Sequence, residues 1–343
     1  MARRPFRPPF PWVRVALALA SMALIGSLSY GCMFWMPGRT AVPPLPPLAA
    51  EEREARERLR HDVEELASAI GERNTLRPEA LERAAGFLEH QLRSAGYAPA
   101  RQTYAVDGQS CSNVEAVLAG RESAMLVVGA HYDSARGSPG ANDNATGVAV
   151  LLELARRLRD ASLGCTVRLL FFVNEEPPYF NTPRMGSRVW AEAAHQRGDR
   201  VVGMLSLETI GFFTEAPDSQ GYPFPMGAFY PDRGRFLGFI GNVDSRQLVR
   251  DVVGSFRQVA TLPSEGAALP DHTTGLDWSD HASFWRFGWP ALMVTDTALF
   301  RYPDYHTARD RPEQVDPDAL ARAASGLEHV IRTMACPGAA ASR

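Results

Sequence analysis

Three apolar runs of the sequence each end in side chains that can bind a metal ion or move a proton. LVVGA is followed by His131 and Asp133, LLFFVN by Glu175 and Glu176, and MLSL by Glu208. In α/β proteins the carboxyl ends of parallel strands meet at one edge of the sheet, where active sites form. We therefore expect these five side chains to lie close together.

The first pair, His131 and Asp133, has the spacing of a metal ligand and its orienting carboxylate. Residues two apart on an extended strand project to the same side. A carboxylate that accepts the second ring N–H of a histidine fixes the tautomer that binds a metal. A purely structural contact at a strand end explains the pair as well, so the pair alone does not define a site.

The segment GANDNATG, which precedes an expected helix, contributes Asp143. Asn144 or Thr146 suits the start of a helix, and the glycines suit a tight turn, so a simple helix entry explains most of this composition. It does not explain Asp143. The two oxygens of one carboxylate can bridge two metal ions at the short separation that paired-metal hydrolases use.

Adjacent carboxylates at the end of an apolar strand, as at Glu175 and Glu176, repel each other when both are ionised. A metal ion would resolve this conflict if one glutamate bound it and the other accepted a proton as general base. The alternative is two solvated acids at the start of a loop, which Pro177 and Pro178 begin.

Two later segments, WSDHASFW and DYHTARD, carry Asp280, His281 and His306. Each has an ordinary explanation, since Ser279 or Asp280 can cap a helix and His306 can be a loop histidine. The ordinary explanations must hold separately at every segment, whereas one site at a sheet edge explains all of them together.

Composition excludes several other chemistries. All 36 basic residues are Arg and there is no Lys, which rules out Schiff-base and phosphate-loop lysines. The net charge of −3 argues against nucleic acid as a partner. The four cysteines, Cys32, Cys111, Cys165 and Cys336, are too dispersed for a zinc finger, and the sequence leaves a Cys111–Cys165 or a Cys165–Cys336 disulfide open.

The ordered motifs HYD, GANDNATG, NEE, an acid after SL, SDHASF and YHTARD resemble those of the co-catalytic zinc exopeptidases, relatives of bacterial leucyl aminopeptidase, aminopeptidase Y and glutamate carboxypeptidase. The resemblance extends from about residue 51 to residue 336 and implies two Zn²⁺ ions per chain. Its implied ligands are His131, Asp143 and Glu208 for one zinc, and Asp143, Glu176 and His306 for the other.

The resemblance also implies catalytic roles. Glu175 matches the general base, Asp133 the residue that orients His131, and Asp280 a position in the hydrogen-bond network around the site. Many members of the family have Asp where Glu208 stands. The implied activity is that of an aminopeptidase on peptide or aminoacyl substrates.

Two other functions remain open at this point. A glutaminyl cyclase-like acyltransferase with one zinc would not need both His131 and Glu208 as ligands. A catalytically inactive binding relative would lack ligands, and none is missing here. If the protein is an enzyme, we expect its substrate pocket to be shaped by the segment NEEPPYFNTPRMGS. Aromatic residues of the irregular region that follows, namely Phe212, Phe213, Tyr222 and Tyr230, would line it as well.

Hydrophobic periodicity indicates the elements that must position these residues. Helices are predicted at 51–70, 78–95, 146–159, 186–196, 244–259 and 316–333, and strands at 101–106, 112–119, 124–129, 166–173, 201–207 and 290–295. This alternation is typical of an α/β fold, and with the resemblance it predicts a mixed, mostly parallel central sheet flanked by helices in one exopeptidase domain, 51–336.

The N-terminus has a separate pattern. Arg3, Arg4, Arg7 and Arg14 precede an uncharged, mostly apolar run over 15–36, whose 22 residues would form a helix about 33 Å long, enough to cross a bilayer. We therefore predict a cytoplasmic tail (1–14), a transmembrane anchor (15–36), a Pro/Ala-rich spacer (37–50) and a C-terminal tail (337–343). The positive charges place the catalytic domain outside the cytoplasm, periplasmic or extracellular. A cleaved signal peptide or a lipid on Cys32 is the alternative.

Overall fold

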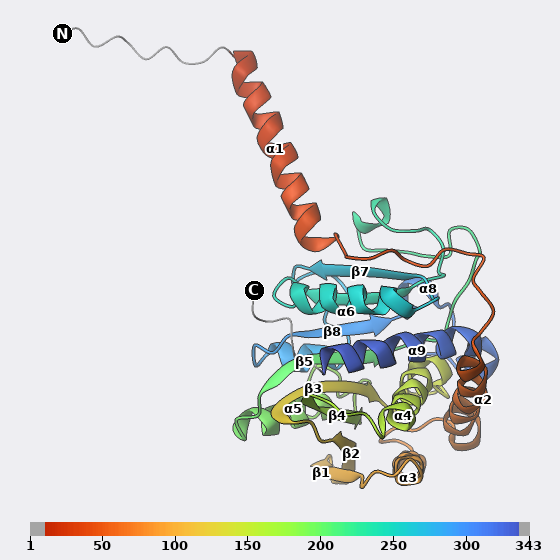
Figure 1. The fold of residues 1–343 in the computed structure, drawn as a ribbon. Coiled ribbons are helices and arrows are strands. Elements are labelled where there is room, and N and C mark those ends of the chain that lie inside the picture. Colours follow the sequence, from red (N-terminus) through yellow and green to blue (C-terminus); the bar gives the residue numbers. More distant parts are fainter. Residues whose placement is uncertain (1–10, 336–343) are drawn as a thin grey trace.

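An eight-stranded mixed sheet forms the centre of the molecule, with the strand order β1-β2-β4-β3-β5-β8-β6-β7. The computed structural model describes residues 11–335 (Figure 1). Its strands are β1 (Ala100–Val106), β2 (Gln109–Leu118), β3 (Glu122–His131), β4 (Cys165–Phe172), β5 (Val201–Glu208), β6 (Leu237–Asn242), β7 (Ser264–Leu269) and β8 (Ala291–Thr295).

Parallel pairing in the middle of the sheet brings the functional strand ends to one edge. Strand β3 pairs in parallel with β4 and β5, and β5 pairs in parallel with β8. The β6–β7 pair is also parallel, whereas β1–β2, β2–β4 and β6–β8 are antiparallel. The predicted mixed, mostly parallel sheet is therefore confirmed, and β3, β4, β5 and β8 all end at the same edge.

Helices cover both faces of this sheet. One face carries α2 (Ala50–Glu64), α3 (Pro78–Ser94), α4 (Thr146–Leu158), α6 (Arg246–Val259) and α9 (Pro317–Met334), and the other carries α5 (Gly186–Gln196) and the short α7 (His281–Trp285). Strand β3 shows why both faces are needed. Its Leu126 and Val128 pack under α4, while Met125 and Val127 pack toward Trp190 of α5, and all four are buried.

Two strands, β6 and β7, were not predicted from the sequence. Their segments, LGFIGN and SEGAAL, are rich in glycine and alanine and contain one β-branched residue, Ile240. Such segments have low intrinsic strand propensity. They form strands here because β6 bonds along its length to β8 on one side and to β7 on the other.

The first helix, α1, spans Pro11–Met33 and projects from the domain (Figure 1). Within residues 11–335, no helix combines the length and the apolar character needed to cross a bilayer, so the transmembrane helix predicted at 15–36 is not supported. The helix also ends earlier than predicted, because residues 34–36 turn to pack on the domain. Residues 1–10 of the predicted tail, and the whole tail 337–343, lie outside the described residues.

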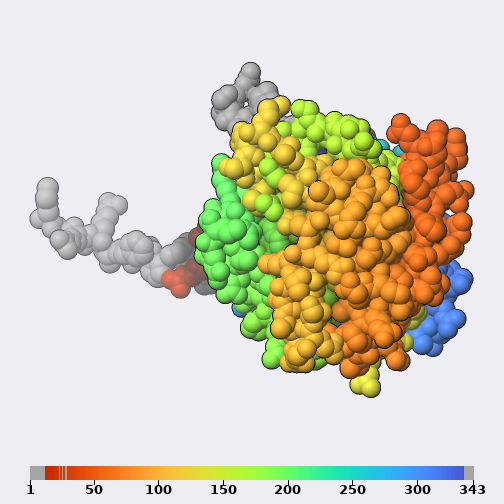
Figure 2. All heavy atoms as spheres, turned by 90° about the horizontal axis from the view of Figure 1, so that it is seen from below, coloured from red at the N-terminus to blue at the C-terminus, as the bar shows by residue number. Residues whose placement is uncertain are grey.

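An extended segment, residues 34–49, connects α1 to α2 along the β7 end of the sheet (Figure 1). Three arginines of the domain bind its backbone or that of the end of α1. Arg250 donates to the carbonyl of Gly31 at 2.5 Å, Arg257 to that of Pro37 at 3.3 Å, and Arg322 to that of Pro46 at 2.6 Å. Figure 2 shows the opposite end of the molecule from below, which is formed largely by α3 and β1 with α2 at one side.

Cysteine pairing follows only in part from the structure. Cys111 is a buried free thiol, so the Cys111–Cys165 disulfide that the sequence left open does not form. Cys336 lies outside the described residues, and the Cys165–Cys336 alternative stays a prediction.

A buried ion-pair cluster fixes the helices that support the site. Glu153 of α4 is fully buried and accepts hydrogen bonds from Arg58 of α2 at 2.7 Å and from Arg157 of α4 at 2.8 Å. Burial alone would raise the pKa of Glu153, but these two arginines outweigh it and hold the pKa below its ordinary value. The carboxylate therefore stabilises the folded state most when it is ionised.

We predict that Glu153→Gln lowers the free energy of unfolding by about 2 kcal/mol at pH 7, because it removes one charge from a buried pair. The difference from the wild type should narrow as the pH falls through the lowered pKa of Glu153, where the wild-type carboxylate also becomes neutral. Urea denaturation at several pH values measures this. Glu57→Gln, which alters an exposed ion pair with Arg56, is the control and should change stability little; an equal loss in both variants would contradict the role of burial.

Candidate metal centre

All five predicted metal ligands meet at the edge where β3, β4 and β5 end. They form two groups that share Asp143, and within each group the ligand atoms lie within 4.8 Å of one another. In the first group, His131 Nε2 lies 3.3 Å from Asp143 Oδ1 and 3.2 Å from Glu208 Oε2. In the second, His306 Nε2 lies 2.9 Å from Asp143 Oδ2 and 3.2 Å from Glu176 Oε2.

The donor atoms of both groups suit zinc. His131 Nε2, Asp143 Oδ2 and Glu176 Oε1 are buried, yet none of them has a hydrogen-bond partner. Buried polar atoms without partners are costly, and one cation in each of the two groups would satisfy all three. Imidazole nitrogens and carboxylate oxygens are typical ligands of hydrolytic zinc sites, so the residues present fit the metal that the sequence predicts.

Asp133 connects the histidine to the two glutamates. Its two carboxylate oxygens accept the backbone N–H groups of Glu175 and Glu176, each at 3.2 Å. Its Oδ1 also lies 3.6 Å from Nδ1 of His131, on the ring side opposite to the proposed metal, and its backbone carbonyl lies 3.2 Å from the same nitrogen. Asp133 thus positions the β4 end against the β3 end, in addition to the predicted orientation of His131.

Glu175 lies beside the ligands without being a member of either group. Its Oε2 is 3.9 Å from His131 Nε2, and the side chain is 8% exposed. Burial raises the pKa of Glu175 well above its ordinary value; the charge of His131 opposes this rise and that of Glu208 adds to it. A carboxyl group with a raised pKa next to a metal centre is suited to accept and return a proton.

The ligands themselves perturb one another strongly. Burial and the charge of Asp143 raise the pKa of Glu176 to about 8, and burial likewise raises that of Glu208. Burial would lower the pKa of His306, but its contacts with Asp143 and Glu176 prevail and raise it to about 10. Zinc binds ionised carboxylates and neutral imidazoles, so zinc binding at these groups is coupled to the loss of protons.

The loop that carries Asp143 is held by neighbours on both sides. Asp310 accepts the backbone N–H of Asn142 at 2.8 Å and that of Asp143 at 3.1 Å. Asn144 donates to the carbonyl of Leu207 at 2.7 Å, which connects the loop to the end of β5 next to Glu208. Asn144 and Asp310 lie in motifs that are recognisable in the sequence, but their roles are not, because these depend on contacts between distant segments.

Arg73 is a functional residue that sequence reasoning missed. Its side chain is fully buried, and it donates to the carbonyls of Tyr132 at 2.6 Å, Pro139 at 2.6 Å and Gly140 at 2.8 Å. These carbonyls belong to the two segments that present His131 and Asp143. One arginine among 36 carries no local signal of this role, because its importance comes from which carbonyls surround it.

Asp280 lies close to the site but is not bonded to the predicted ligands. It is fully buried, and neither carboxylate oxygen has a partner that satisfies hydrogen-bond geometry. Burial raises its pKa to about 7, against the opposing charge of His131. Its neighbour Ser279 makes the direct contact, donating to Glu208 Oε2 at 2.8 Å. The position in the hydrogen-bond network around the site that is expected of Asp280 stays a prediction.

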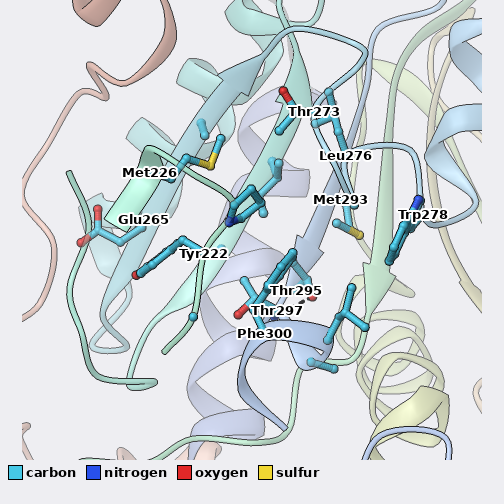
Figure 3. Close-up of a pocket in the computed structure, with 18 of the residues that line it drawn as sticks. Tyr222, Met226, Glu265, Thr273, Leu276, Trp278, Met293, Thr295, Thr297 and Phe300 are labelled. Carbon is cyan, nitrogen blue, oxygen red and sulfur yellow. Dashed lines mark hydrogen bonds between the residues drawn. The ribbon is translucent and has the colours of Figure 1, made fainter. Parts of the chain in front are cut away.

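A large, mainly apolar pocket opens beside the centre, with about 890 Å³ of empty space including the part open to solvent. It reaches from Glu208 across β8 and β6 to β7, and Figure 3 shows Met293, Thr295, Trp278 and Tyr222 around it. Tyr230 also lines it, on the same loop as Tyr222.

Only part of the aromatic lining expected of a substrate pocket is found at this one. Phe212 and Phe213 do not line it; Phe212 packs against Tyr302 and Phe213 lies under Arg301. Both rings pack instead on residues that follow β8, whereas Tyr222 and Tyr230, further along the loop, face the pocket. The segment after Glu176 does not line this pocket either.

The fold and the two candidate ligand groups together suit a metal-dependent hydrolase. The chain belongs to peptidase family M28, whose model matches residues 113–331, so the resemblance predicted from the motifs is confirmed. Membership, together with the relatives described next, makes the protein a zinc-dependent hydrolase.

Comparison with individual proteins agrees with this family. The chain is 33% identical over 304 residues to the uncharacterized protein YfbL of Escherichia coli, covering 86% of this chain and 92% of that one. It is 27% identical over 247 residues to leucine aminopeptidase 1 of Arthroderma otae, covering 66% of this chain and only 60% of the relative.

Among solved structures, the zinc aminopeptidase BSAP of Bacillus subtilis has the same fold, with a TM-score of 0.66 at 13% identity over 82% of this chain and 95% of that one. A glutaminyl cyclase of Porphyromonas gingivalis also shares it, with a TM-score of 0.60 at 19% identity over 82% and 98% of the two chains. These likenesses show the fold alone.

We predict that Arg73→Met weakens zinc binding about 10-fold or more, because the segments that present His131 and Asp143 lose their common clamp. Competition with a chromogenic chelator measures the affinity without depending on catalysis. Arg77→Met, which removes an exposed guanidinium on the same stretch of chain, is the matched control. Equal zinc affinity in the Arg73 variant and the wild type would contradict the assigned role.

Proposed function

We propose that this protein is a dizinc aminopeptidase that hydrolyses the N-terminal peptide bond of its substrates. The observation that carries the proposal is the sharing of Asp143 by two complete ligand groups, each with one histidine and a second carboxylate. Two such groups around one bridging carboxylate suit a pair of zinc ions.

The roles of the side chains follow from their positions. His131, Asp143 and Glu208 would hold one zinc ion, and Asp143, Glu176 and His306 the other. Zinc in these positions would polarise the substrate carbonyl and make a water molecule more acidic. Glu175 would accept the proton of that water and later deliver it to the leaving amine, since its Oε2 lies 3.9 Å from His131 Nε2 and it belongs to neither group.

The pocket supports a preference for a large apolar N-terminal residue. It begins at Glu208, one of the proposed ligands, and its walls are mainly apolar and aromatic. A substrate held with its scissile carbonyl at the centre would place its first side chain there. Relatives that are named leucine aminopeptidases are consistent with this choice.

The glutaminyl cyclase alternative shares the fold but has no observation in its favour here. It would use one zinc, whereas the described residues provide both groups. An inactive binding relative would be expected to lose ligands or the base, and all of them are present at the centre. Zinc analysis of the purified chain separates the aminopeptidase from the glutaminyl cyclase alternative. Two ions per chain would support the aminopeptidase, and one ion would contradict it.

We predict that Glu175→Gln retains two zinc ions and the fold but lowers kcat for leucyl anilide by about 10²-fold to 10⁴-fold, because it removes the proton acceptor and no ligand. Zinc content, thermal stability and kcat are measured on the same preparation. Glu192→Gln, a neutralised glutamate exposed on α5, should behave as the wild type. Full turnover by the Glu175 variant would refute its role as base.

We also propose that the N-terminal segment holds the catalytic domain at a membrane, outside the cytoplasm. Two observations support this proposal. Basic residues precede an uncharged run in the sequence. Large apolar side chains of α1 are exposed, with exposed fractions of 59% to 69% for Val15, Leu17, Leu19, Leu24 and Met22. The full chain expressed in a bacterium should then sediment with membranes after an alkaline carbonate wash, and a chain that begins at residue 37 should not. Recovery of the full chain in the soluble fraction would contradict this proposal.

A further inference from the structure

The outer side of the substrate pocket rests on a residue far from it in sequence. Phe34, just after α1, stacks on Phe229 with ring centroids 4.8 Å apart and an interplanar angle of 17°. It also meets the ring of Tyr230 edge-on, at 6.0 Å and 68°. Because Tyr230 lines the pocket, Phe34 contacts the pocket wall from behind.

The wall itself consists of two stacked tyrosines. Tyr230 and Tyr222 lie with ring centroids 5.8 Å apart and an interplanar angle of 23°, and both line the pocket. Tyr230 donates its hydroxyl to the carbonyl of Gly266 on β7 at 2.7 Å, and Tyr222 donates to that of Pro231 at 2.5 Å. With their hydroxyl groups occupied, these side chains offer the substrate mainly aromatic surface.

The loop that carries this wall has little regular structure to hold it. Between β5 and β6, the only helical turn of the described residues is Met226–Ala228. Isolated backbone hydrogen bonds, such as that from Gln220 N–H to the carbonyl of Asp232 at 3.1 Å, hold parts of it, and side-chain packing must hold the rest. Phe34 provides part of that packing, since it lies against the cluster of Ala267, Leu269 and Leu276, which also line the pocket.

Phe34 is in turn held by the domain. Arg250 donates to the carbonyls of Gly31 at 2.5 Å and Cys32 at 3.3 Å, and Arg257 donates to that of Pro37 at 3.3 Å. Hydrogen bonds on both sides of Phe34 thus fix the backbone that presents its ring. Phe34 lies well before residue 113, where the match to the family model begins.

We propose that Phe34 is a positioning residue that keeps the Tyr222–Tyr230 wall in place and thereby determines the preference for large N-terminal side chains. This inference rests on the proposed aminopeptidase function. A leucine or phenylalanine side chain would reach the wall and depend on its position, whereas the methyl group of alanine would not. The chemistry at the zinc ligands does not involve the wall, so kcat should be preserved.

The test compares Phe34→Ala with Trp35→Ala in the full chain. Trp35 is the neighbouring aromatic residue; it is 54% exposed, contacts Arg250 and does not line the pocket. We expect Phe34→Ala to raise KM for leucyl and phenylalanyl anilides about fivefold to tenfold, the effect of losing one aromatic contact. Its KM for alanyl anilide, its kcat and its zinc content should stay at the wild-type values, and Trp35→Ala should match the wild type throughout.

Several results would overturn the inference. Equal changes in KM for the leucyl and alanyl substrates, a change in kcat alone, or an equal effect of Trp35→Ala would each show that Phe34 does not set the preference. If Phe34→Ala does not fold, Phe34→Leu is tested in its place. We then expect a smaller rise in KM for the leucyl substrate and no change in KM for the alanyl substrate. A wild-type chain that hydrolyses none of these substrates would instead refute the proposed function.

Discussion

Mutual repulsion of four buried carboxylates at one sheet edge is the constraint on which the rest of the structure depends. Asp143, Glu175, Glu176 and Glu208 are all buried at this edge, where like charges disfavour the ionisation of all four carboxylates. The chain has no lysine, and the nearby Arg73 spends its N–H groups on backbone carbonyls. His131, His306 and Arg73 offset part of this charge, and zinc bound at the two groups would supply further positive charge.

Residues that do not bind the metal maintain this costly arrangement. Asp133 accepts the backbone N–H groups of both glutamates after β4, and Asp310 accepts those of the Asp143 loop. Arg73 connects the segments of His131 and Asp143. Each of these residues joins parts of the chain that are distant in sequence, so the ligands are preorganised by long-range contacts and not by local turns.

The strand ends could be predicted because burial and chemistry coincide there. Glu208 ends an apolar run, and a carboxylate in that place is readable without a structure. Strands β6 and β7 could not be predicted, since their glycines and alanines acquire strand structure only through pairing with β8 and with each other. The same holds for Phe212 and Phe213, whose aromatic character says nothing about which way a loop turns.

The sequence by itself determined the ligand types, their order and hence the family, because metal chemistry restricts which residues can stand after a buried strand. Tertiary structure alone decided that Asp310 and Asn144 hold the Asp143 loop, that Arg73 bonds to the segments of His131 and Asp143, and that Phe34 lies against Tyr230. The physical reason is that ligand identity is a property of single residues, whereas distances between side chains depend on how distant segments pack together.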